Sequence, residues 1–456
     1  MSNRLIGYGA YLPRYRLAGS AVGLRRGDRV VASFDEDSTT MAVAAAATAV
    51  DGQKMRANVY FATSSPAYAD KTNATTVHAA LGLPSACLAM DLCGTGRSAV
   101  GAWRLASETG GLAVAADVRV GRPGSADEKL GGDGAAALLF GEGEGLAEVV
   151  ASVSLTEEFL DRWRPPTTST GQQWEERFGA RRYGDLITAA VTQTLDQAGL
   201  PSIDHVALAC PNSAIVKRAA TLVKGDRSTV TSPVGHSGAA DALIALCAVL
   251  DSAGANETIL VVSAVDGCDT LLLRTTDALH GARQPAPVNA QREIGLEVPY
   301  LTYLSWRGLV ELEPPRRPEP DRPAAPPSSR AAGWKFGFTG SRCEACGFVH
   351  LPPMNVCRSC GATDRMVAAP AAGLGGTIAT YTVDRLAYSP SPPVVQAVVD
   401  VDGGGRCTLE IADAEPDRLT VGGRVEFTFR RLFTAGGVHD YFWKARLTEP
   451  LEVEES

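Results

Sequence analysis

The chain has 456 residues, of which 45% are hydrophobic and 21% are charged, and its 51 acidic and 43 basic side chains give a formal net charge of -8. This composition excludes a disordered or collagen-like chain, and the acidic balance argues against a protein that binds nucleic acid through a basic face. No apolar run reaches the roughly 18 residues of a membrane span, and the length predicts about three structural units.

The N-terminal sequence MSNRLIGYGAYLP is predicted to form a first strand. It lacks the order of charged, apolar and small residues that marks a signal peptide, so we expect a cytoplasmic protein that neither enters nor spans a membrane. Four of the ten cysteines are bunched between residues 343 and 360. In a reducing compartment such a cluster is typical of a metal site rather than of disulfides.

Up to about residue 310, short β-branched runs alternate with longer stretches rich in alanine and leucine, which predicts βα units on a mostly parallel sheet. The same order of four segments occurs twice: a strand, a turn that leads into a helix, a second strand, and a final glycine- or leucine-containing apolar segment. Corresponding segments of the two sets lie about 135 to 150 residues apart in the sequence. The first set is 59–65, 91–106, 112–118 and 131–141, and the second is 205–213, 233–250, 258–267 and 267–273. We therefore expect a duplicated unit, although alanine- and glycine-rich α/β proteins can also resemble themselves by composition alone.

Cys93 is the first candidate for chemistry, because it follows an apolar strand and precedes the turn GTGRS and a helix. At a helix N-terminus the exposed amides and the dipole favour a thiolate and lower the pKa of a cysteine. Gly94 and Gly96 would let a substrate carbonyl approach backbone N–H groups, as in an oxyanion hole. A thiolate beside such donors is suited to acyl transfer through a thioester, whereas the alternative is a small buried cysteine.

His236 occupies the place in the second half that Cys93 occupies in the first. If a pseudo-two-fold axis relates the halves, both helix starts face one shared pocket, and the imidazole there could act as a base, an acid or an oxyanion donor. The other five histidines lie in contexts that indicate structural or surface positions.

These segments resemble the thiolase superfamily, and specifically its branch of 3-hydroxy-3-methylglutaryl-CoA synthases and ketoacyl synthases III. The resemblance covers about residues 3 to 305. It is most specific at the Cys93 turn and at the stretches GGDGAAALLFG (131–141), YADKTNATTVHAALGL (68–83) and FLDRWRPP (159–166). It implies a duplicated thiolase-like fold with αβαβα layers, a dimer, and Cys93 as the nucleophile that accepts the acyl group.

The sequence departs from that family at three positions. Ser64 stands where synthases carry a catalytic Glu, Ala209 stands where their His-x-Pro-Asn motif has its histidine, and His236 replaces the Asn of a Gly-Asn turn. Hydroxymethylglutaryl-CoA synthesis as such is therefore doubtful. The Gly-His turn is similar to a loop of thiolases, so we expect His236 to be the polar partner of Cys93, and Asn212 could hold a carbonyl or a water.

The spacing Cys343-x2-Cys346-x10-Cys357-x2-Cys360 predicts a tetrahedral thiolate site, because each C-x2-C knuckle is followed by a glycine. Four thiolates leave no vacant position, so we expect a structural zinc. An iron site of rubredoxin type and a chance cluster of reduced cysteines are the alternatives.

Beyond this cluster, five runs alternate apolar and polar residues, at 375–383, 393–401, 406–413, 423–432 and 440–447. They predict a small barrel of the OB type. Some OB barrels bind nucleic acid, but this chain is acidic and has no basic run with interleaved aromatic residues. Knuckles followed by a barrel resemble the zinc-ribbon/OB-fold family that accompanies thiolase-like acyl-CoA enzymes, over about 334–448.

We expect five regions: thiolase-like halves at 1–146 and 147–310, a proline-rich linker at 311–333, a zinc ribbon at 334–369 and an OB barrel at 370–456. The stretch ELEPPRRPEPDRPAAPPSS (311–329) is predicted to be an extended connector that forms no helix.

The predicted function is an acyl-CoA acyltransferase of hydroxymethylglutaryl-CoA synthase type that forms or cleaves a carbon–carbon bond through a Cys93 thioester. We expect its substrate to be a coenzyme A thioester and the protein to form a homodimer. The alternative is a non-catalytic subunit that binds acyl-CoA and docks to a thiolase partner.

Overall fold

The structure, a computed structural model, describes residues 4–51, 56–313, 316 and 320–448. These residues form two compact units. The first holds most of the chain up to Val310, and the second holds the chain from Glu311 onward with the short segments 34–36 and 79–82. Within the described ranges, no helix has the length and apolarity that crossing a bilayer requires. The five finer domain boundaries stay predictions, and residues 449–456 of the expected barrel lie outside the described part.

The first unit is built on one ten-stranded sheet in the order β12-β11-β13-β14-β8-β1-β7-β6-β4-β5. Each half therefore has the same strand order, read outward from the centre, and the predicted duplication is confirmed. The halves meet where β1 and β8 pair antiparallel at Leu5 and Ala147. The strands of the first half are β1 (Arg4–Tyr11), β4 (Val59–Thr63), β5 (Ala89–Cys93), β6 (Gly111–Asp117) and β7 (Gly134–Gly141). Those of the second are β8 (Ala147–Thr156), β11 (His205–Ala209), β12 (Ser228–Val230), β13 (Thr258–Ser263) and β14 (Gly267–Thr275).

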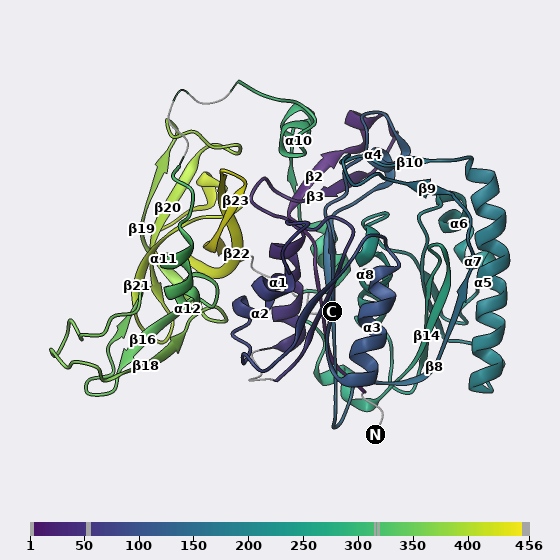
Figure 1. Ribbon diagram of the computed structural model, residues 1–456, viewed down its shortest axis with the longest axis horizontal. Coiled ribbons are helices and arrows are strands. Elements are labelled where there is room, and N and C mark those ends of the chain that lie inside the picture. The colour runs from purple at the N-terminus through teal and green to yellow at the C-terminus, as the bar shows by residue number, and fades with distance from the viewer. Residues whose placement is uncertain (1–3, 52–55, 314–315, 317–319, 449–456) are drawn as a thin grey trace. The chain divides into compact units, whose positions relative to one another are not determined.

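Helices cover both faces of this sheet. On β13, Ile259 and Val261 join a buried cluster with helices α3 (Ser98–Thr109) and α8 (Asp241–Leu250). The alternate residue Leu260 joins a second cluster with α5 (Glu176–Ala198) on the opposite face. Such alternation is expected of a strand buried on both sides. Figure 1 shows α5 lying outside β8 and β14, so α3 and α8 form the central layer of the expected layered fold.

Helix α1 (Ser38–Val50) packs against β1 at very short range. A side chain at Gly7 or Gly9 would collide with the carbonyl oxygens of Ala49 and Ala45, so only glycine fits at these two positions. The shorter elements of this unit are β2 (Tyr15–Ala18), β3 (Asp28–Val31), α2 (Ala74–Ala80), α4 (Ala126–Leu130), β9 (Arg162–Trp163), β10 (Gln172–Gln173), α6 (Ser213–Lys217), α7 (Ala219–Leu222), α9 (Val288–Glu293), β15 (Leu296–Glu297) and α10 (Tyr300–Trp306).

The second unit begins with the proline-rich segment, and here one prediction is wrong. Helix α11 (Ala325–Arg330) begins within the stretch that was expected to form no helix, and α12 (Ala332–Lys335) follows it. The prolines of α11 stand in its first turn, where the missing N–H has no helical partner in any case, so they start the helix instead of breaking it. Residues 314–315 and 317–319 of the linker lie outside the described part.

The zinc-ribbon region forms a three-stranded sheet of β16 (Thr339–Cys343), β17 (Val349–His350) and β18 (Met366–Pro370), with β16 in the middle. The tail forms a five-stranded sheet in the order β21-β20-β19-β22-β23. Its strands are β19 (Gly375–Asp384), β20 (Val394–Val401), β21 (Arg406–Glu410), β22 (Arg424–Ala435) and β23 (Val438–Leu447). A parallel bridge between Ile411 and Ala445 joins the two edges, so the five predicted strands close into a small barrel.

Candidate functional site

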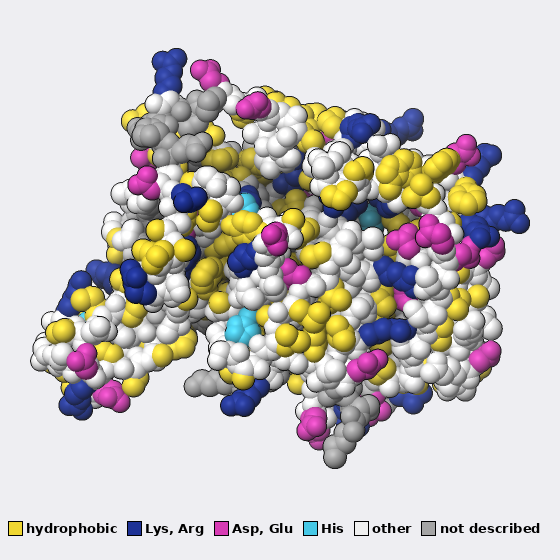
Figure 2. Space-filling view, in the orientation of Figure 1, with side chains coloured by type: hydrophobic (Ala, Val, Ile, Leu, Met, Phe, Trp, Pro, Cys, Tyr) yellow, Lys and Arg dark blue, Asp and Glu magenta, His cyan; other side chains and the backbone are white. Residues whose placement is uncertain are grey.

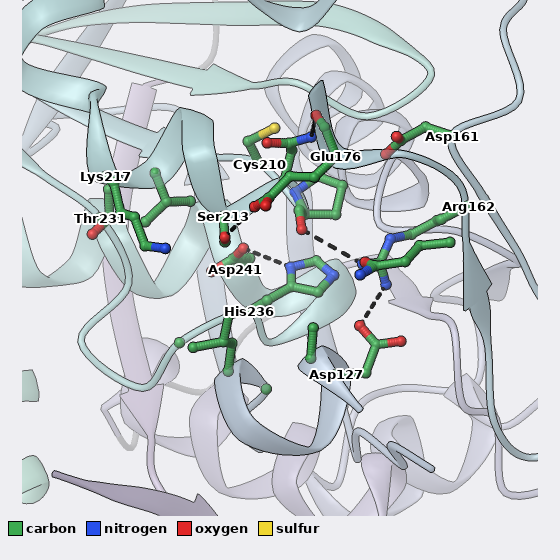
Figure 3. A pocket seen from close by; sticks show the side chains of 18 of the residues that line it. Asp127, Asp161, Arg162, Glu176, Cys210, Ser213, Lys217, Thr231, His236 and Asp241 are labelled. Carbon is green, nitrogen blue, oxygen red and sulfur yellow. Dashed lines mark hydrogen bonds and ion pairs between the residues drawn. The ribbon is translucent and has the colours of Figure 1, made fainter. Parts of the chain in front are cut away.

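A cavity of about 320 Å³ lies in the first unit beside the start of α8. Its walls come from α4, β9, the end of β11, α6 and the turn before α8, which are far apart in the sequence. Apolar side chains such as Leu208 and Trp174 line it together with charged groups. Figure 3 shows Asp241, Arg162 and Asp127 next to the His236 ring.

His236 and Asp241 form a hydrogen-bonded pair in this cavity. The Nδ1 atom of His236 lies 2.9 Å from a carboxylate oxygen of Asp241, the first residue of α8. A carboxylate only accepts, so Nδ1 carries the proton and Nε2 has a free lone pair. Burial lowers the pKa of His236 below its ordinary value, and this effect outweighs the opposing effect of Asp241. The imidazole is therefore neutral near pH 7 and able to accept a proton.

An ion pair lies next to the imidazole. Arg162 donates to Asp127 at 2.9 Å, and Figure 3 shows this pair beside the His236 ring. Burial acts to raise the pKa of Asp127, but Arg162 and Arg119 outweigh it and hold that pKa below its ordinary value. Sequence reasoning missed Asp241, Asp127 and Arg162 as site residues. Arg162 lies within FLDRWRPP, a stretch already singled out, whereas nothing in the sequence places Asp127 opposite it.

Asn212 lines the same cavity, but its side chain is occupied. Its Oδ1 accepts from the backbone N–H of Ala214 and Ile215 as the N-cap of α6, and its Nδ2 donates to the carbonyl of Glu176 at 3.0 Å. The asparagine therefore fixes the start of a helix that forms one wall of the cavity. Ala209 ends β11 and contributes no polar side chain at this wall.

Cys93 does not line this cavity, although the two turns match. Cys93 precedes the first residue of α3 by five positions, and His236 precedes the first residue of α8 by five. A Cβ built on Gly96 would lie 3.1 Å from the carbonyl oxygen of Gly238, so the two turns pack against each other. Cys93 itself ends strand β5 and is exposed.

The environment of Cys93 differs from the predicted one. Partial burial, followed by the charges of Asp91 and Asp117, raises the pKa of the thiol to about 11, whereas the sequence predicted a lowered value. The reason is position: the thiol stands at the end of a strand, with four residues between it and α3, so the helix dipole does not reach it. The N–H of Gly94 is also committed, because it donates to the carbonyl of Thr63 at 3.1 Å.

A buried carboxylate links the two turns. Asp117 accepts from the Thr63 hydroxyl at 2.8 Å, from the Ser64 hydroxyl at 2.7 Å and from the backbone N–H of Ala239 at 2.7 Å. The Ser64 hydroxyl also accepts from Arg119 at 3.1 Å. Through Asp117, the loop that follows β4 is therefore tied to the turn that contains His236.

The four zinc-ribbon cysteines fit a tetrahedral metal ion. Their sulfur atoms all lie within 4.8 Å of one another, with 3.7 Å between Cys343 and Cys360 and 3.6 Å between Cys346 and Cys357. Four thiolates bonded to zinc at about 2.3 Å would stand about 3.8 Å apart at the corners of a tetrahedron. These residues would hold a closed structural zinc, which would stabilise the ribbon.

Comparison with known proteins gives separate matches for the first unit, the zinc ribbon and the barrel. Residues 337–364 match the family described as "ChsH2, rubredoxin-like zinc ribbon domain", and residues 369–430 match "ChsH2, C-terminal OB-fold domain". The first unit is similar in fold to the structure "MvaS in complex with 3-hydroxy-3-methylglutaryl coenzyme A", with a TM-score of 0.58 and 16% identity over 71% of this chain and 95% of that one.

Two curated relatives are hydroxymethylglutaryl-CoA synthases. The Archaeoglobus fulgidus protein is 29% identical over 343 residues, which are 67% of this chain and 99% of the relative. The Aeropyrum pernix protein is 31% identical over 344 residues, which are 67% of this chain and 94% of the relative. By this likeness the chain belongs to the hydroxymethylglutaryl-CoA synthase family.

Proposed function

We propose that this protein, an acyl-CoA acyltransferase of hydroxymethylglutaryl-CoA synthase type, uses Cys93 as its acyl carrier and the His236–Asp241 pair as its base. The observation that carries the proposal is the 2.9 Å hydrogen bond from His236 Nδ1 to Asp241 inside the cavity. It fixes the tautomer in which Nε2 accepts protons. The CoA and 3-hydroxy-3-methylglutaryl-CoA complexes of the structural neighbours support a coenzyme A thioester as substrate.

In the acyl-transfer step, Cys93 loses its proton and its sulfur attacks the thioester carbonyl. A carbon–sulfur bond forms on Cys93, the bond to coenzyme A breaks, and the departing thiolate takes up a proton. In the carbon–carbon step, His236 Nε2 takes a proton from the carbon beside the thioester carbonyl of a second substrate, and Asp241 stabilises the imidazolium that forms. The resulting carbanion attacks the carbonyl carbon of the acyl group on Cys93, so a carbon–carbon bond forms and the carbon–sulfur bond to Cys93 breaks. The departing Cys93 thiolate takes up a proton, and the imidazolium returns to its neutral form by losing one. The raised pKa of the thiol and the lowered pKa of the imidazole leave both groups neutral at rest, so the Cys93 thiol has to give up its proton before its sulfur can attack.

The test is protein acylation followed by intact mass. Wild-type protein incubated with acetyl-CoA should gain one acetyl group, and Cys93→Ala should gain none. Cys87→Ala is the matched control, because Cys87 is a partly buried free thiol of the same unit and should leave the adduct in place. An adduct that persists in Cys93→Ala would remove Cys93 from the mechanism.

A second candidate function is a non-catalytic subunit that binds acyl-CoA and delivers it to a thiolase. Two observations favour it: Cys93 does not line the cavity, and the pKa of its thiol is raised to about 11. It predicts acetyl-CoA binding without any adduct on the wild-type protein, and activity of a thiolase complex that is insensitive to Cys93→Ala. The homodimer, the thiolase partner and the cytoplasmic location stay predictions.

A further inference from the structure

Asp161 differs from the other charged side chains of the His236 cavity because it has no polar partner. It lines the cavity just before β9 and is only 5% exposed. Among the residues that the structure describes, its carboxylate accepts no hydrogen bond and joins no ion pair. A buried carboxylate is costly unless a cation or a donor pairs with it. The proposed mechanism gives Asp161 no role, so its partner is still to be found.

Helix α5 holds the Asp161 carboxylate in place. A Cβ built on Gly179, in the first turns of α5, would lie 2.2 Å from a carboxylate oxygen of Asp161. Only glycine lets the helix backbone approach the carboxylate so closely. The helix therefore occupies one side of Asp161, and the cavity remains on the side that the carboxylate lines.

Arg162, the next residue in the chain, does not serve as the missing partner. One terminal nitrogen of its guanidinium donates to Asp127 at 2.9 Å. The other donates to Gln173 at 3.2 Å and to the carbonyl of Pro211 at 3.5 Å. Both terminal nitrogens of Arg162 are therefore engaged away from Asp161.

The remaining charges add to the negative side of the balance. Burial raises the pKa of Asp161 above its ordinary value, and the charges of Asp266 and Glu176 add to this effect, while the adjacent guanidinium opposes it. Lys217 is the other cation on the cavity wall, but Figure 3 shows it on the opposite side of His236 from Asp161. Among the described residues, the Asp161 end of the cavity thus carries an excess of negative charge.

An indole ring lies beside this carboxylate. The backbone N–H of Trp174 donates to the carbonyl of Asp161 at 2.7 Å, and Trp174 lines the same cavity although its side chain is 57% exposed. Figure 2 shows hydrophobic side chains next to charged ones over the region where Figure 1 labels β10 and the start of α5. The faces of aromatic rings attract organic cations, so a carboxylate next to an indole is suited to an ammonium group.

We propose that Asp161 and Trp174 bind an ammonium group of the second substrate, the thioester that gives up a proton to His236. The chemical class is an aminoacyl thioester of coenzyme A, in which the thioester end reacts and the ammonium end anchors the molecule. The inference rests on the proposed function for the thioester, and it names the substrate class. A metal ion is not favoured, because among the described residues only the zinc-ribbon cysteines form a group of three or more side chains that could hold one.

The experiment compares β-alanyl-CoA with butyryl-CoA, which have the same shape but end in an ammonium group and a methyl group. Binding to the full-length Cys93→Ala protein is measured by calorimetry, so that no acyl group is transferred to Cys93. This protein should bind β-alanyl-CoA about tenfold more tightly than butyryl-CoA, since a hydrogen bond to a charged group contributes roughly tenfold or more. Asp161→Asn, added to Cys93→Ala, should reduce the ratio of the two dissociation constants to about one.

Two further variants in the same Cys93→Ala protein complete the comparison. Trp174→Leu should reduce the ratio about threefold, because it removes the ring but keeps the carboxylate. It also keeps the inference testable if Asp161→Asn does not fold, since Trp174 is largely exposed. Glu175→Gln is the matched control, because this exposed carboxylate adjoins Trp174 in the sequence but does not line the cavity, and it should keep the ratio.

Equal affinities for the two thioesters in the Cys93→Ala protein would overturn the inference and leave the proposed function intact. A ratio that stays near ten in Asp161→Asn would overturn it too, because Asp161 would then act through the fold or not at all. The acylation test is separate. A preference for β-alanyl-CoA that depends on Asp161, in a protein whose Cys93 gains no acetyl group, would support the ammonium site and contradict the proposed chemistry. If neither thioester binds, both proposals fail.

Discussion

The Cys93 thiol and the His236 imidazole hold equivalent positions in the two halves, and burial acts on them in opposite directions. It raises the pKa of the thiol to about 11 and lowers the pKa of the imidazole, because in both cases it disfavours the charged form. The resting site therefore contains a thiol and a neutral imidazole instead of a thiolate–imidazolium pair. Sequence context alone predicted a lowered thiol pKa, since it could not show that the helix begins four residues too late.

The raised pKa of Cys93 predicts a steep pH dependence of alkylation. Only the thiolate reacts with iodoacetamide, so the rate at Cys93 should increase about tenfold per pH unit from pH 7 to pH 10. Peptide mapping by mass spectrometry after timed quenching measures it, with unfolded protein as the reference thiol. A rate that levels off below pH 8 would show an activated thiolate and contradict the assignment.

Asp241 is predicted to position His236 during catalysis. In Asp241→Asn the turnover number should fall about 10²- to 10⁴-fold, the range typical of general base catalysis. Because the Asp241 hydrogen bond raises the pKa of His236 against the effect of burial, its loss lowers that pKa further. The acidic limb of the pH–rate profile, which lies below about 6.5 in the wild type, should therefore move to still lower pH.

Glu108→Gln, which alters an exposed carboxylate on α3, is the control and should keep the wild-type profile. An Asp241→Asn variant with reduced turnover but an unmoved acidic limb would show that Asp241 acts on the fold and not on His236.

At the scale of secondary-structure elements, hydrogen bonds to the short turns before the helices fix the positions of the side chains at the candidate site. The turn before α3 is held by Arg97, which donates to Asp269 at 2.8 Å and to the carbonyl of Asp266 at 2.7 Å, both from the second half. Asn212 holds the start of α6 in a similar way. Its residue type was noticed in the sequence, but a capping asparagine and a ligand-binding asparagine look the same without coordinates.

Asn212 is predicted to act through helix α6 and not on the substrate. Asn212→Ala removes the acceptor for two backbone N–H groups and should lower the free energy of unfolding by about 1 kcal/mol. Asn212→Asp keeps an N-cap acceptor and should restore most of that stability and of the activity. Urea denaturation and steady-state kinetics measure the two effects. If Asn212→Ala and Asn212→Asp both lost activity while their free energy of unfolding stayed unchanged, Asn212 would have to act on the substrate directly.

At the scale of the whole molecule, the chain joins a duplicated α/β unit to a unit made of a zinc ribbon and a barrel. The first unit folds around a sheet with ten strands and two large buried clusters. The ribbon has only three short strands, so we infer that it depends on metal for stability.

Removal of one zinc ligand should therefore affect one unit only. Cys346→Ser is expected to lose the single bound zinc, measured by metal analysis, and to lower the thermal midpoint of the second unit. The unfolding of the first unit should not change. Cys87→Ser, which alters a thiol of the first unit, should keep its zinc. A protein that retains zinc and stability after Cys346→Ser would contradict the four-thiolate site.

The amino-acid sequence by itself determined the periodic and local features of this protein: the duplicated strand and helix pattern, the five barrel strands and the cysteine knuckles. These features depend on residues that are near neighbours, so their spacing is visible along the chain. Only the tertiary structure decided which charges share a cavity and how burial shifts their pKa values. Asp127 and Arg162 meet beside His236 because elements distant in sequence converge there, and desolvation depends on that packing.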